Sequence, residues 1–185
     1  MSRILLLTLI PVILFAQGWK WENPKPLGDP IQQVFFVDSV HGWMVPENTT
    51  LLKTTDGKNW NTLYTNVYFD NIYFINKNEG WGVGRKSFEA EINNIYHTKD
   101  GGLNWEIQLT DTVGFYNVYF LDKLNGWATD NFAYDRPIFH TTDGGLNWKP
   151  EGGGLFRIGD SGQGIGAYIL FSDSLKGFAV FFGAR

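Results

Sequence analysis

The sequence predicts an all-β protein built from small antiparallel sheets that repeat along the chain. Three observations carry this prediction. Aromatic residues make up 17% of the 185 positions and glycines number 22, a composition typical of short strands joined by tight turns. Four ten-residue segments align without a gap, and three of them are followed by a shared Asp-Gly motif. The motifs recur with a period in the forties, which is the spacing of four-stranded β-propeller blades.

The first strand of each unit, strand A, is predicted from the four aligned segments. They read VFFVDSVHGW from Val34, IYFINKNEGW from Ile72, VYFLDKLNGW from Val118 and ILFSDSLKGF from Ile169. Three of them begin with four apolar residues and the fourth with three. Successive side chains of a strand point to opposite faces, so both faces of strand A are expected to be buried.

The other three strands of a unit follow from the same alignment. In the second copy, strand B is predicted at Gly80 to Gly84, strand C at Ile95 to Thr98 and strand D at Trp105 to Leu109. The Asp-Gly motif therefore forms the turn from C to D. Its aspartates, Asp56, Asp100 and Asp143, are 44 and 43 residues apart.

The repeats end after strands A and B of a fourth unit. The sequence thus predicts an incomplete arc of about three and a half four-stranded antiparallel blades, with Asp-Gly turns, that belongs to a larger ring. Such an arc would expose strand edges.

Composition excludes several classes of function. The chain has no cysteine, so it has no disulfide framework, thiolate metal site or cysteine nucleophile. Its net charge of -4 argues against nucleic acid as a partner, because phosphate binding needs a basic face. His97 and His140 occupy the same repeat position and should diverge around a ring. No metal site and no cofactor are therefore expected.

Residues 1–16 have the pattern of a secretory signal peptide. Arg3 precedes the apolar run Ile4 to Phe15, and Ala16 follows it, which is the order of charge, apolar core and small residue that such signals share. The apolar run is short for a membrane span, although a retained anchor is the alternative. We expect residues 17–185 to form the mature repeat domain, either secreted or held in the periplasm or at the cell surface.

The Asp-Gly motif resembles the Asp-box of BNR, or sialidase-type, repeats: Ser or Thr, any residue, Asp, any residue, Gly, two residues and an aromatic. Its residues are Thr54, Asp56, Gly57 and Trp60 in the first copy, Thr98, Asp100, Gly102 and Trp105 in the second, and Thr141, Asp143, Gly145 and Trp148 in the third. The first copy lacks one residue between Gly57 and Trp60. With a Gly-Trp element before each box, the repeats resemble more specifically the photosystem II stability/assembly factor-like family. That resemblance implies a β-propeller and a chaperone-like role for a membrane protein complex of photosynthesis.

The boxes are predicted to be structural. Asp accepts backbone N–H bonds within the turn, Gly supplies a positive φ, and Trp packs between blades. The three aspartates should lie on separate blades, where they cannot share a proton or a metal ion.

Two short strings carry an alternative interpretation. Phe156–Ile158 resembles the start of the FRIP string of sialidases, and Gly159–Gly162 spells the GDSG of chymotrypsin-like proteases. Neither string has its usual sequence context, and a serine without an oriented His and Asp is inert. We therefore predict a protein without catalytic activity. A sialidase-like glycoside hydrolase or a carbohydrate-binding propeller is the alternative.

Apart from the residue missing from the first box, the repeats differ in length in the segments from B to C and from D to A, which an up-and-down blade places at the same end. Loops on one side of a rigid scaffold usually carry binding. Arg85, Arg136 and Arg157 fall in these segments, and Arg suits carboxylate recognition and interfaces. The hypothesis is a protein-binding face for a protein partner such as a membrane protein complex. Plain solvated loop residues are the alternative.

Overall fold

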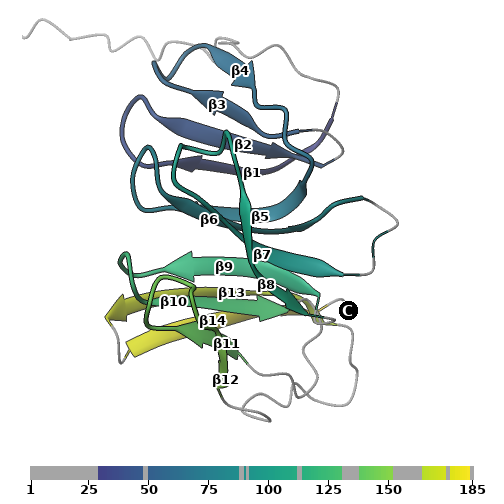
Figure 1. Cartoon of the computed structure of the whole chain (residues 1–185), viewed down its shortest axis with the longest axis vertical. Helices are drawn as coiled ribbons and strands as arrows, with labels where there is room; N and C mark the ends of the chain where they lie inside the picture. The colour runs from purple at the N-terminus through teal and green to yellow at the C-terminus, as the bar shows by residue number, and fades with distance from the viewer. Residues whose placement is uncertain are drawn as a thin grey trace, which may run out of the picture.

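All regular elements in the described part of the chain are β-strands (Figure 1). The computed structural model describes residues 29–47, 50–87, 90, 92–111, 114–130, 138–151, 164–173 and 176–183. For Asp111, Asp130, 164–173 and 177–183 only the backbone is described. Within these ranges no helix is long and apolar enough to span a membrane.

The strands form three complete blades and half of a fourth. Blade 1 consists of β1 (Ile31–Phe36), β2 (Gly42–Pro46), β3 (Leu52–Thr54) and β4 (Trp60–Thr62); blade 2 of β5 (Tyr68–Phe74), β6 (Gly80–Arg85), β7 (Asn93–Thr98) and β8 (Glu106–Asp111); blade 3 of β9 (Phe115–Phe120), β10 (Gly126–Asp130), β11 (Ile138–Thr141) and β12 (Lys149–Glu151); and the half-blade of β13 (Gly164–Asp173) and β14 (Lys176–Gly183). Each is an antiparallel meander whose strands pair in sequence order. The predicted fold class and the order of strands A to D are confirmed.

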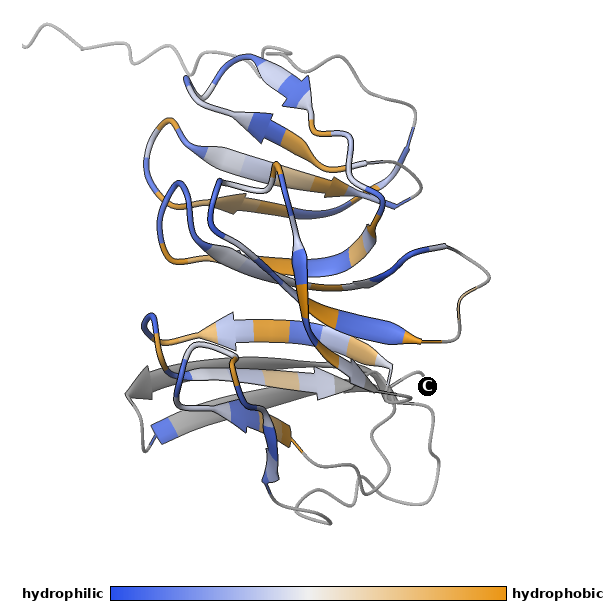
Figure 2. Ribbon diagram, viewed as in Figure 1, coloured by the Kyte–Doolittle hydropathy of each residue, from blue (hydrophilic) through white to orange (hydrophobic). Residues whose placement is uncertain are grey.

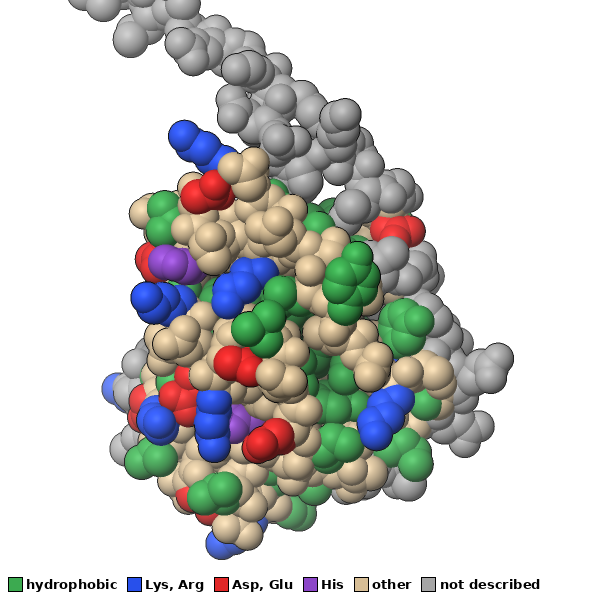
Figure 3. Space-filling view, turned by 45° about the horizontal axis from the view of Figure 1, so that its top comes forward, with side chains coloured by type: hydrophobic (Ala, Val, Ile, Leu, Met, Phe, Trp, Pro, Cys, Tyr) green, Lys and Arg blue, Asp and Glu red, His purple; other side chains and the backbone are tan. Residues whose placement is uncertain are grey.

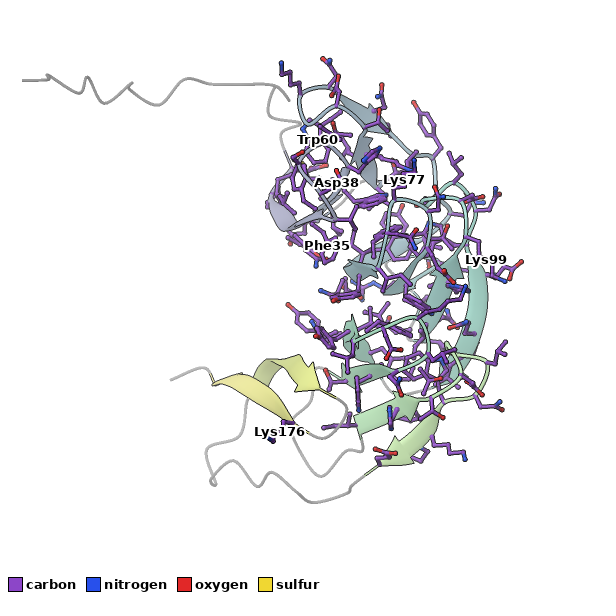
Figure 4. The ribbon with its side chains drawn as sticks, turned by 90° about the vertical axis from the view of Figure 1, so that its left-hand side faces the viewer. Phe35, Asp38, Trp60, Lys77, Lys99 and Lys176 are labelled. Atoms are coloured by element: carbon purple, nitrogen blue, oxygen red, sulfur yellow. The ribbon has the colours of Figure 1, made fainter. Side chains whose placement is uncertain are left out.

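The blades stand side by side along an open arc. Strand β5 contacts β1, β9 contacts β5, and β13 contacts β9 and β10, so the first strands of successive blades are neighbours. Figure 4 shows Trp60 of blade 1 at one end of the arc and Lys176 of the half-blade at the other. The sheets do not close into a ring in the described residues, as predicted for about three and a half blades.

The last apolar residue of each quartet lies just outside strand A. The Val37 N–H donates to the His41 carbonyl at 3.1 Å. Asp38 Oδ1 then accepts the N–H groups of Val40 and His41 at 2.9 and 2.7 Å. Equivalent bonds recur in blades 2 and 3. The fourth apolar residue and the Asp or Asn after it therefore build the A to B turn.

The glycine of each Gly-Trp element is required by a ring of strand A. Gly42, Gly80 and Gly126 pair with Phe36, Phe74 and Phe120, respectively. A Cβ atom on these glycines would lie 2.6, 2.6 and 2.5 Å from Cε1 of the paired ring. The phenylalanine thus fills the space that a side chain at the glycine would need.

Each of the two contacts between complete blades is centred on a phenylalanine held by two tryptophans. Phe74 of blade 2 stacks on Trp43 of blade 1, with centroids 3.6 Å apart and planes 7° apart, and Trp105 meets the Phe74 ring edge-on at 5.9 Å. The equivalent set between blades 2 and 3 is Trp81, Phe120 and Trp148. These rings lie in two hydrophobic clusters, one in each gap between complete blades, and Figure 2 shows the hydrophobic strand segments that face these gaps.

Polar bonds across the same gaps were not predicted from the sequence. The Trp43 indole N–H donates to the Gly101 carbonyl at 3.0 Å, and the Trp81 indole to the Gly144 carbonyl at 3.3 Å. The Gly-Trp elements of blades 1 and 2 therefore each hold the Asp-box turn of the next blade. The tryptophan of one blade and the box of the next form a single joint.

In blades 1 and 2 the amide residue before the apolar quartet adds a second bond to the next blade. Gln33 accepts the Ile72 N–H at 2.8 Å and donates to the Ile72 carbonyl at 3.0 Å. Asn71, one repeat later, accepts the Val118 N–H at 3.0 Å. These side chains satisfy backbone groups of the neighbouring strand A that would otherwise be buried without a partner.

The expectation that strand A is buried on both faces is wrong for blade 1. Val34 is 51% exposed, whereas its equivalents Ile72 and Val118 are 0% and 2% exposed. Phe36 is 44% exposed, whereas Phe74 is 2% exposed. The reason is that blade 1 has no preceding blade among the described residues, so Phe36 meets Trp60 of its own blade edge-on at 5.7 Å but has no tryptophan of a preceding blade stacked on it.

Candidate functional site

The blades present two different ends to solvent. Asp-box turns and A to B turns share one end, because the Gly57 N–H donates to the Val40 carbonyl at 2.9 Å and the Gly101 N–H to the Asn78 carbonyl at 2.7 Å. We call this the turn end. Antiparallel strands place the B to C and D to A segments at the opposite end, the loop end. In Figure 3 charged side chains of both signs gather on the left, over the turn end, while hydrophobic side chains dominate the right.

The Asp-box turns are closed by one repeated set of hydrogen bonds. In the second copy, Thr98 Oγ1 donates to Asp100 Oδ1 at 2.9 Å and accepts the Gly102 N–H at 2.9 Å. Asp100 Oδ1 also accepts the Asn104 N–H at 2.9 Å, and Oδ2 accepts the Asn104 side-chain amide at 2.7 Å. The first and third copies repeat this set. Both oxygens of the carboxylate are thus engaged inside the turn.

The asparagine before the box tryptophan was not among the predicted residues. Asn59, Asn104 and Asn147 each bond their box aspartate through backbone and side-chain N–H groups. The signal was present in the sequence as an Asn-Trp dipeptide in all three boxes. The glycines that follow the aspartates adopt the left-handed conformation, with φ between 70° and 92°.

Hydrogen bonding lowers the pKa of the turn-end carboxylates. The N–H groups of Asn59 and Lys58 hold the pKa of Asp56 well below its usual range, and the side-chain amide of Asn147 lowers the pKa of Asp143. A carboxyl group of this kind is ionised at neutral pH and makes a poor general acid. The box carboxylates therefore act as hydrogen-bond acceptors that close the turn.

The residue before each box threonine stacks on the tryptophan of its own blade. His97 lies 4.8 Å from Trp81, and His140 lies 4.6 Å from Trp127, between ring centroids. Lys53 is their equivalent in blade 1, with its ammonium 5.3 Å from the Trp43 ring. Burial lowers the pKa of His97. In the described part of the chain no three His, Cys, Asp or Glu side chains are grouped so as to hold a metal ion.

Arg85, predicted in a loop, lies at the end of β6 and is only partly exposed. Its guanidinium lowers the pKa of Asp70, against the larger effect of burial, which raises it. Asn93 donates to the Phe115 carbonyl at 2.8 Å and to Asp70 Oδ2 at 3.3 Å. Arg85 thus stands beside a buried polar cluster at the loop end. Arg136 and Arg157 lie outside the described residues, as do residues 156–162 and 1–16.

A pocket of about 490 Å³ opens at the loop end between blades 1 and 2. Its lining residues are Thr50, Thr65, Asn66, Val67, Tyr68 and Lys86. They offer hydroxyl and amide groups, one ammonium group and an apolar wall. Tyr64, in the same D to A segment, is 89% exposed. The loop end therefore combines hydrogen-bonding groups with accessible apolar surface, which is the composition of many protein interfaces.

Comparison with known proteins places this architecture in one family. Residues 16–150 match the family model described as photosynthesis system II assembly factor YCF48. The chain is 29% identical, over 105 residues, to the photosystem II assembly lipoprotein Ycf48 of Synechococcus sp. (strain CC9902). That alignment covers 52% of this chain and 30% of the relative.

Solved structures of Ycf48 proteins are also similar to this chain. A structure titled "YCF48 bound to D1 peptide" is 28% identical with a TM-score of 0.55, and covers 68% of this chain and 41% of its own. YCF48 from Cyanidioschyzon merolae is 26% identical with a TM-score of 0.54, and covers 69% and 38%. The chain thus spans about two fifths of these proteins and 30% of the curated relative.

An ancestral GH74 enzyme matches at a TM-score of 0.59 and 15% identity, over 84% of this chain and 22% of the enzyme. At that identity the similarity concerns the fold alone. The family model, in contrast, covers all three complete blades except the last residue of β12. This chain therefore belongs to the Ycf48 family of photosynthesis system II assembly factors.

Proposed function

We propose that this chain acts as a photosystem II assembly factor that binds a segment of a photosystem II protein at the loop end of its blades. The observation that carries the proposal is the family match, together with the similarity to a Ycf48 structure that holds a D1 peptide. The described residues supply a suitable surface, with the pocket between blades 1 and 2 next to Tyr64. A rigid scaffold with variable loops at one end suits recognition better than turnover.

The arginines of the loop segments are the proposed anchors. Arg85 is held at the end of β6, and Arg136 and Arg157 are placed by the sequence in the following B to C and D to A segments. An arginine binds carboxylates through two parallel N–H bonds. An acidic or carboxyl-terminal peptide segment is therefore the proposed ligand class.

Export is part of the same proposal. The signal-like residues 1–16 would direct residues 17–185 out of the cytoplasm, to the periplasm or cell surface. The related Synechococcus protein is named a lipoprotein, whereas this chain has no cysteine for a lipid to modify. We propose that this protein is released after cleavage, and mass analysis of the protein recovered from cells would show a new amino terminus at Gln17.

The binding proposal is tested with overlapping fluorescent peptides that cover the D1 protein, titrated with the purified chain and followed by anisotropy. Arg85→Ala, Arg136→Ala and Arg157→Ala together should weaken peptide binding about tenfold or more, since a hydrogen bond to a charged group contributes about 1.5–3 kcal/mol. The double variant at positions 136 and 157 leaves the Asp70 cluster intact. It should weaken binding in the same direction.

A matched control removes three cations from the turn end, where Lys58, Lys77 and Lys99 are exposed. Replacing these three with alanine should leave peptide affinity unchanged. If the two triple variants lowered peptide affinity equally, the arginines would contribute only general charge attraction and not a specific contact. Hydrolysis of a sialoside or another glycan that is lost on Arg157→Ala would instead support a hydrolase.

A further inference from the structure

Two contacts across the joint between blades 2 and 3 share one neighbour, His97. The Trp81 indole of blade 2 donates to the Gly144 carbonyl of blade 3 at 3.3 Å. Glu79, two residues before Trp81, places Oε2 3.2 Å from the ammonium group of Lys123 in blade 3. The His97 ring is stacked on Trp81 at 4.8 Å, and its Nε2 lies 3.4 Å from Glu79 Oε1. A change in the charge of His97 therefore acts on both contacts.

His97 is buried with an unsatisfied ring nitrogen. The residue is 7% exposed. Its Nε2 makes no hydrogen bond within the described part of the chain, and its 3.4 Å approach to Glu79 is longer than such bonds. A proton on the ring would turn Nε2 into a charged donor, whose bonds to carboxylates are about 2.7–2.9 Å long. The Glu79 carboxylate would then move towards His97 and away from Lys123. The proton thus exchanges a contact between blades for one inside blade 2.

The charged groups around His97 do not offset the cost of burying a cation there. Glu79, and Glu106 on the paired strand β8, favour the protonated ring, whereas Lys99 opposes it. Lys123, on the other side of Glu79, is a second positive charge nearby. Burial is the largest effect and lowers the pKa of His97 below its ordinary value of 6.5. The ring therefore binds a proton more readily when the joint opens and water reaches it, so protons favour the open joint.

We propose that His97 makes the joint between blades 2 and 3 sensitive to protons: when the ring is protonated, Glu79 leaves Lys123 and the contact between the blades loosens. Because the folded chain holds the neutral ring, the joint is closed at neutral pH and loosens as the pH falls below 6.5. The loops that these two blades carry at the loop end are then no longer held at a fixed spacing. This inference does not rest on the proposed function.

The joint between blades 1 and 2 supplies an internal reference. Its equivalent positions hold no carboxylate, and a lysine replaces the histidine; they are His41, Lys53 and Lys77. The Lys53 ammonium group donates to the Gly101 carbonyl at 3.0 Å, as does the Trp43 indole. Lysine keeps its charge between pH 5 and 7, and His41 pairs with Asp38 of its own turn at 2.8 Å. The Trp43 bond should therefore not respond to pH in this range.

NMR titration of the histidine rings in the full chain is the first test. The midpoint of the His97 signals should lie below 6.5, the ordinary value for histidine, because burial disfavours the charged ring. A midpoint at or above 6.5 would overturn the proposal. This measurement needs no variant, so it remains decisive even where a substitution at position 97 prevents folding.

The second test follows the exchange of the Trp81 and Trp43 indole N–H groups with solvent. After correction for the intrinsic pH dependence of exchange, the Trp81 N–H should lose protection by about twofold or more between pH 7 and 5, since the open joint binds the proton more tightly than the closed one. The Trp43 N–H should keep its protection. Constant protection at Trp81, or an equal loss at both indoles, contradicts a proton-sensitive joint.

Variants assign the effect to His97. His97→Gln keeps a polar side chain that cannot be protonated, so the protection of the Trp81 N–H should be the same at pH 7 and 5. Glu79→Gln removes a carboxylate that favours the protonated ring, so the loss should begin at a lower pH. The matched control is His140→Gln, because His140 has the same repeat position but pairs with Glu151 of its own blade at 2.8 Å. It should keep the profile of the unaltered chain.

The pH profile separates this role from a merely structural one. If His97 only filled space, His97→Gln would lower the protection of the Trp81 N–H equally at every pH, and the difference between pH 7 and 5 would persist. That result would refute the proposal, as would a flat profile in His140→Gln or an onset in Glu79→Gln at the same pH as in the unaltered chain. Circular dichroism of each variant shows whether the blades are folded.

Discussion

Replacing Gly80 with alanine should destabilise the protein, while the same change at Gly42 should not. Both glycines pair with a phenylalanine whose Cε1 atom lies 2.6 Å from the position of the new Cβ. The two sites differ in the freedom of that ring. Phe74 is 2% exposed and stacked on Trp43 at 3.6 Å, whereas Phe36 is 44% exposed. The pair of variants therefore isolates the effect of a neighbouring blade.

The magnitude follows from the distance that the ring must move. Ordinary van der Waals contact begins at 3.4 Å, and the nearest ring atom at Gly80, Cδ1 of Phe74, is 2.4 Å from the new Cβ. The stacked ring must therefore shift by about 1.0 Å, and overpacking of this kind costs about 1–3 kcal/mol. Removing a glycine recovers about 0.4–1 kcal/mol by restricting the unfolded chain. The net loss expected at Gly80 is about 1–2 kcal/mol. At Gly42 the exposed ring can turn aside, and the change should stay within about 0.5 kcal/mol.

Urea unfolding followed by tryptophan fluorescence measures both variants. Gly126→Ala serves as a replicate, because Phe120 is stacked on Trp81 at 3.5 Å, and it should match Gly80→Ala. Equal losses at Gly42 and Gly80 would refute the reasoning. So would an unaffected Gly80→Ala, since then the ring would not be fixed by the blade before it.

Three further predictions concern bonds between and within blades. Asn71→Leu should lower the free energy of unfolding by about 1–3 kcal/mol, because it leaves the buried Val118 N–H without an acceptor, and unchanged urea unfolding would contradict this. Trp43→Phe keeps the stack but loses the bond to the Gly101 carbonyl, so a loss of about 0.5–1.5 kcal/mol is expected in the same assay; a much larger loss would mean that the stack itself depends on the indole. Stability should also fall as pH drops from 5 towards 2, because carboxylates with a lowered folded pKa stabilise the fold above the usual value of 3.8 and lose that contribution as they are protonated. Asp100→Asn should lessen this acid dependence, and an acid dependence equal to that of the unaltered chain would count against the box as its source.

The elements that repeat were predictable, because each repeat is a separate copy of the same local pattern. The alignment predicted strands B, C and D of blade 2 to within two residues at each end, as the comparison of Ile95–Thr98 with β7 (Asn93–Thr98) shows. Strand A was placed less well, because β5 begins at Tyr68, four residues before the apolar quartet. It also predicted the C to D turn, since the side chains of the box Asp and Thr bond groups within their own turn. Local chemistry of this kind is complete within a few residues.

Contacts between repeats were not predictable in the same way. The bond from Gln33 to Ile72 joins residues 39 positions apart. The local sequence of neither segment indicates that the other will be its hydrogen-bond partner. Arg85 and Asp70 occur as a pair in blade 2 alone, so the repeat pattern gave no signal for them. The exposure of Val34 also depends on the neighbouring blade and could not be read from an apolar quartet shared by all copies.

The direction of the joints between blades explains which segments of the repeat vary in length. Trp43 reaches forward to Phe74 and to the Gly101 carbonyl, so the distance from the Gly-Trp element to the next Asp-box is fixed by a physical contact. All of these atoms lie in the strands or at the turn end. In the described residues the B to C and D to A segments supply neither the stacked rings nor the indole bonds, so they can lengthen without breaking these contacts. Leu51 and Val67 from these segments do pack in the first hydrophobic cluster. A partner can therefore be recognised at the loop end without any demand on the stacked rings and indole bonds between the blades.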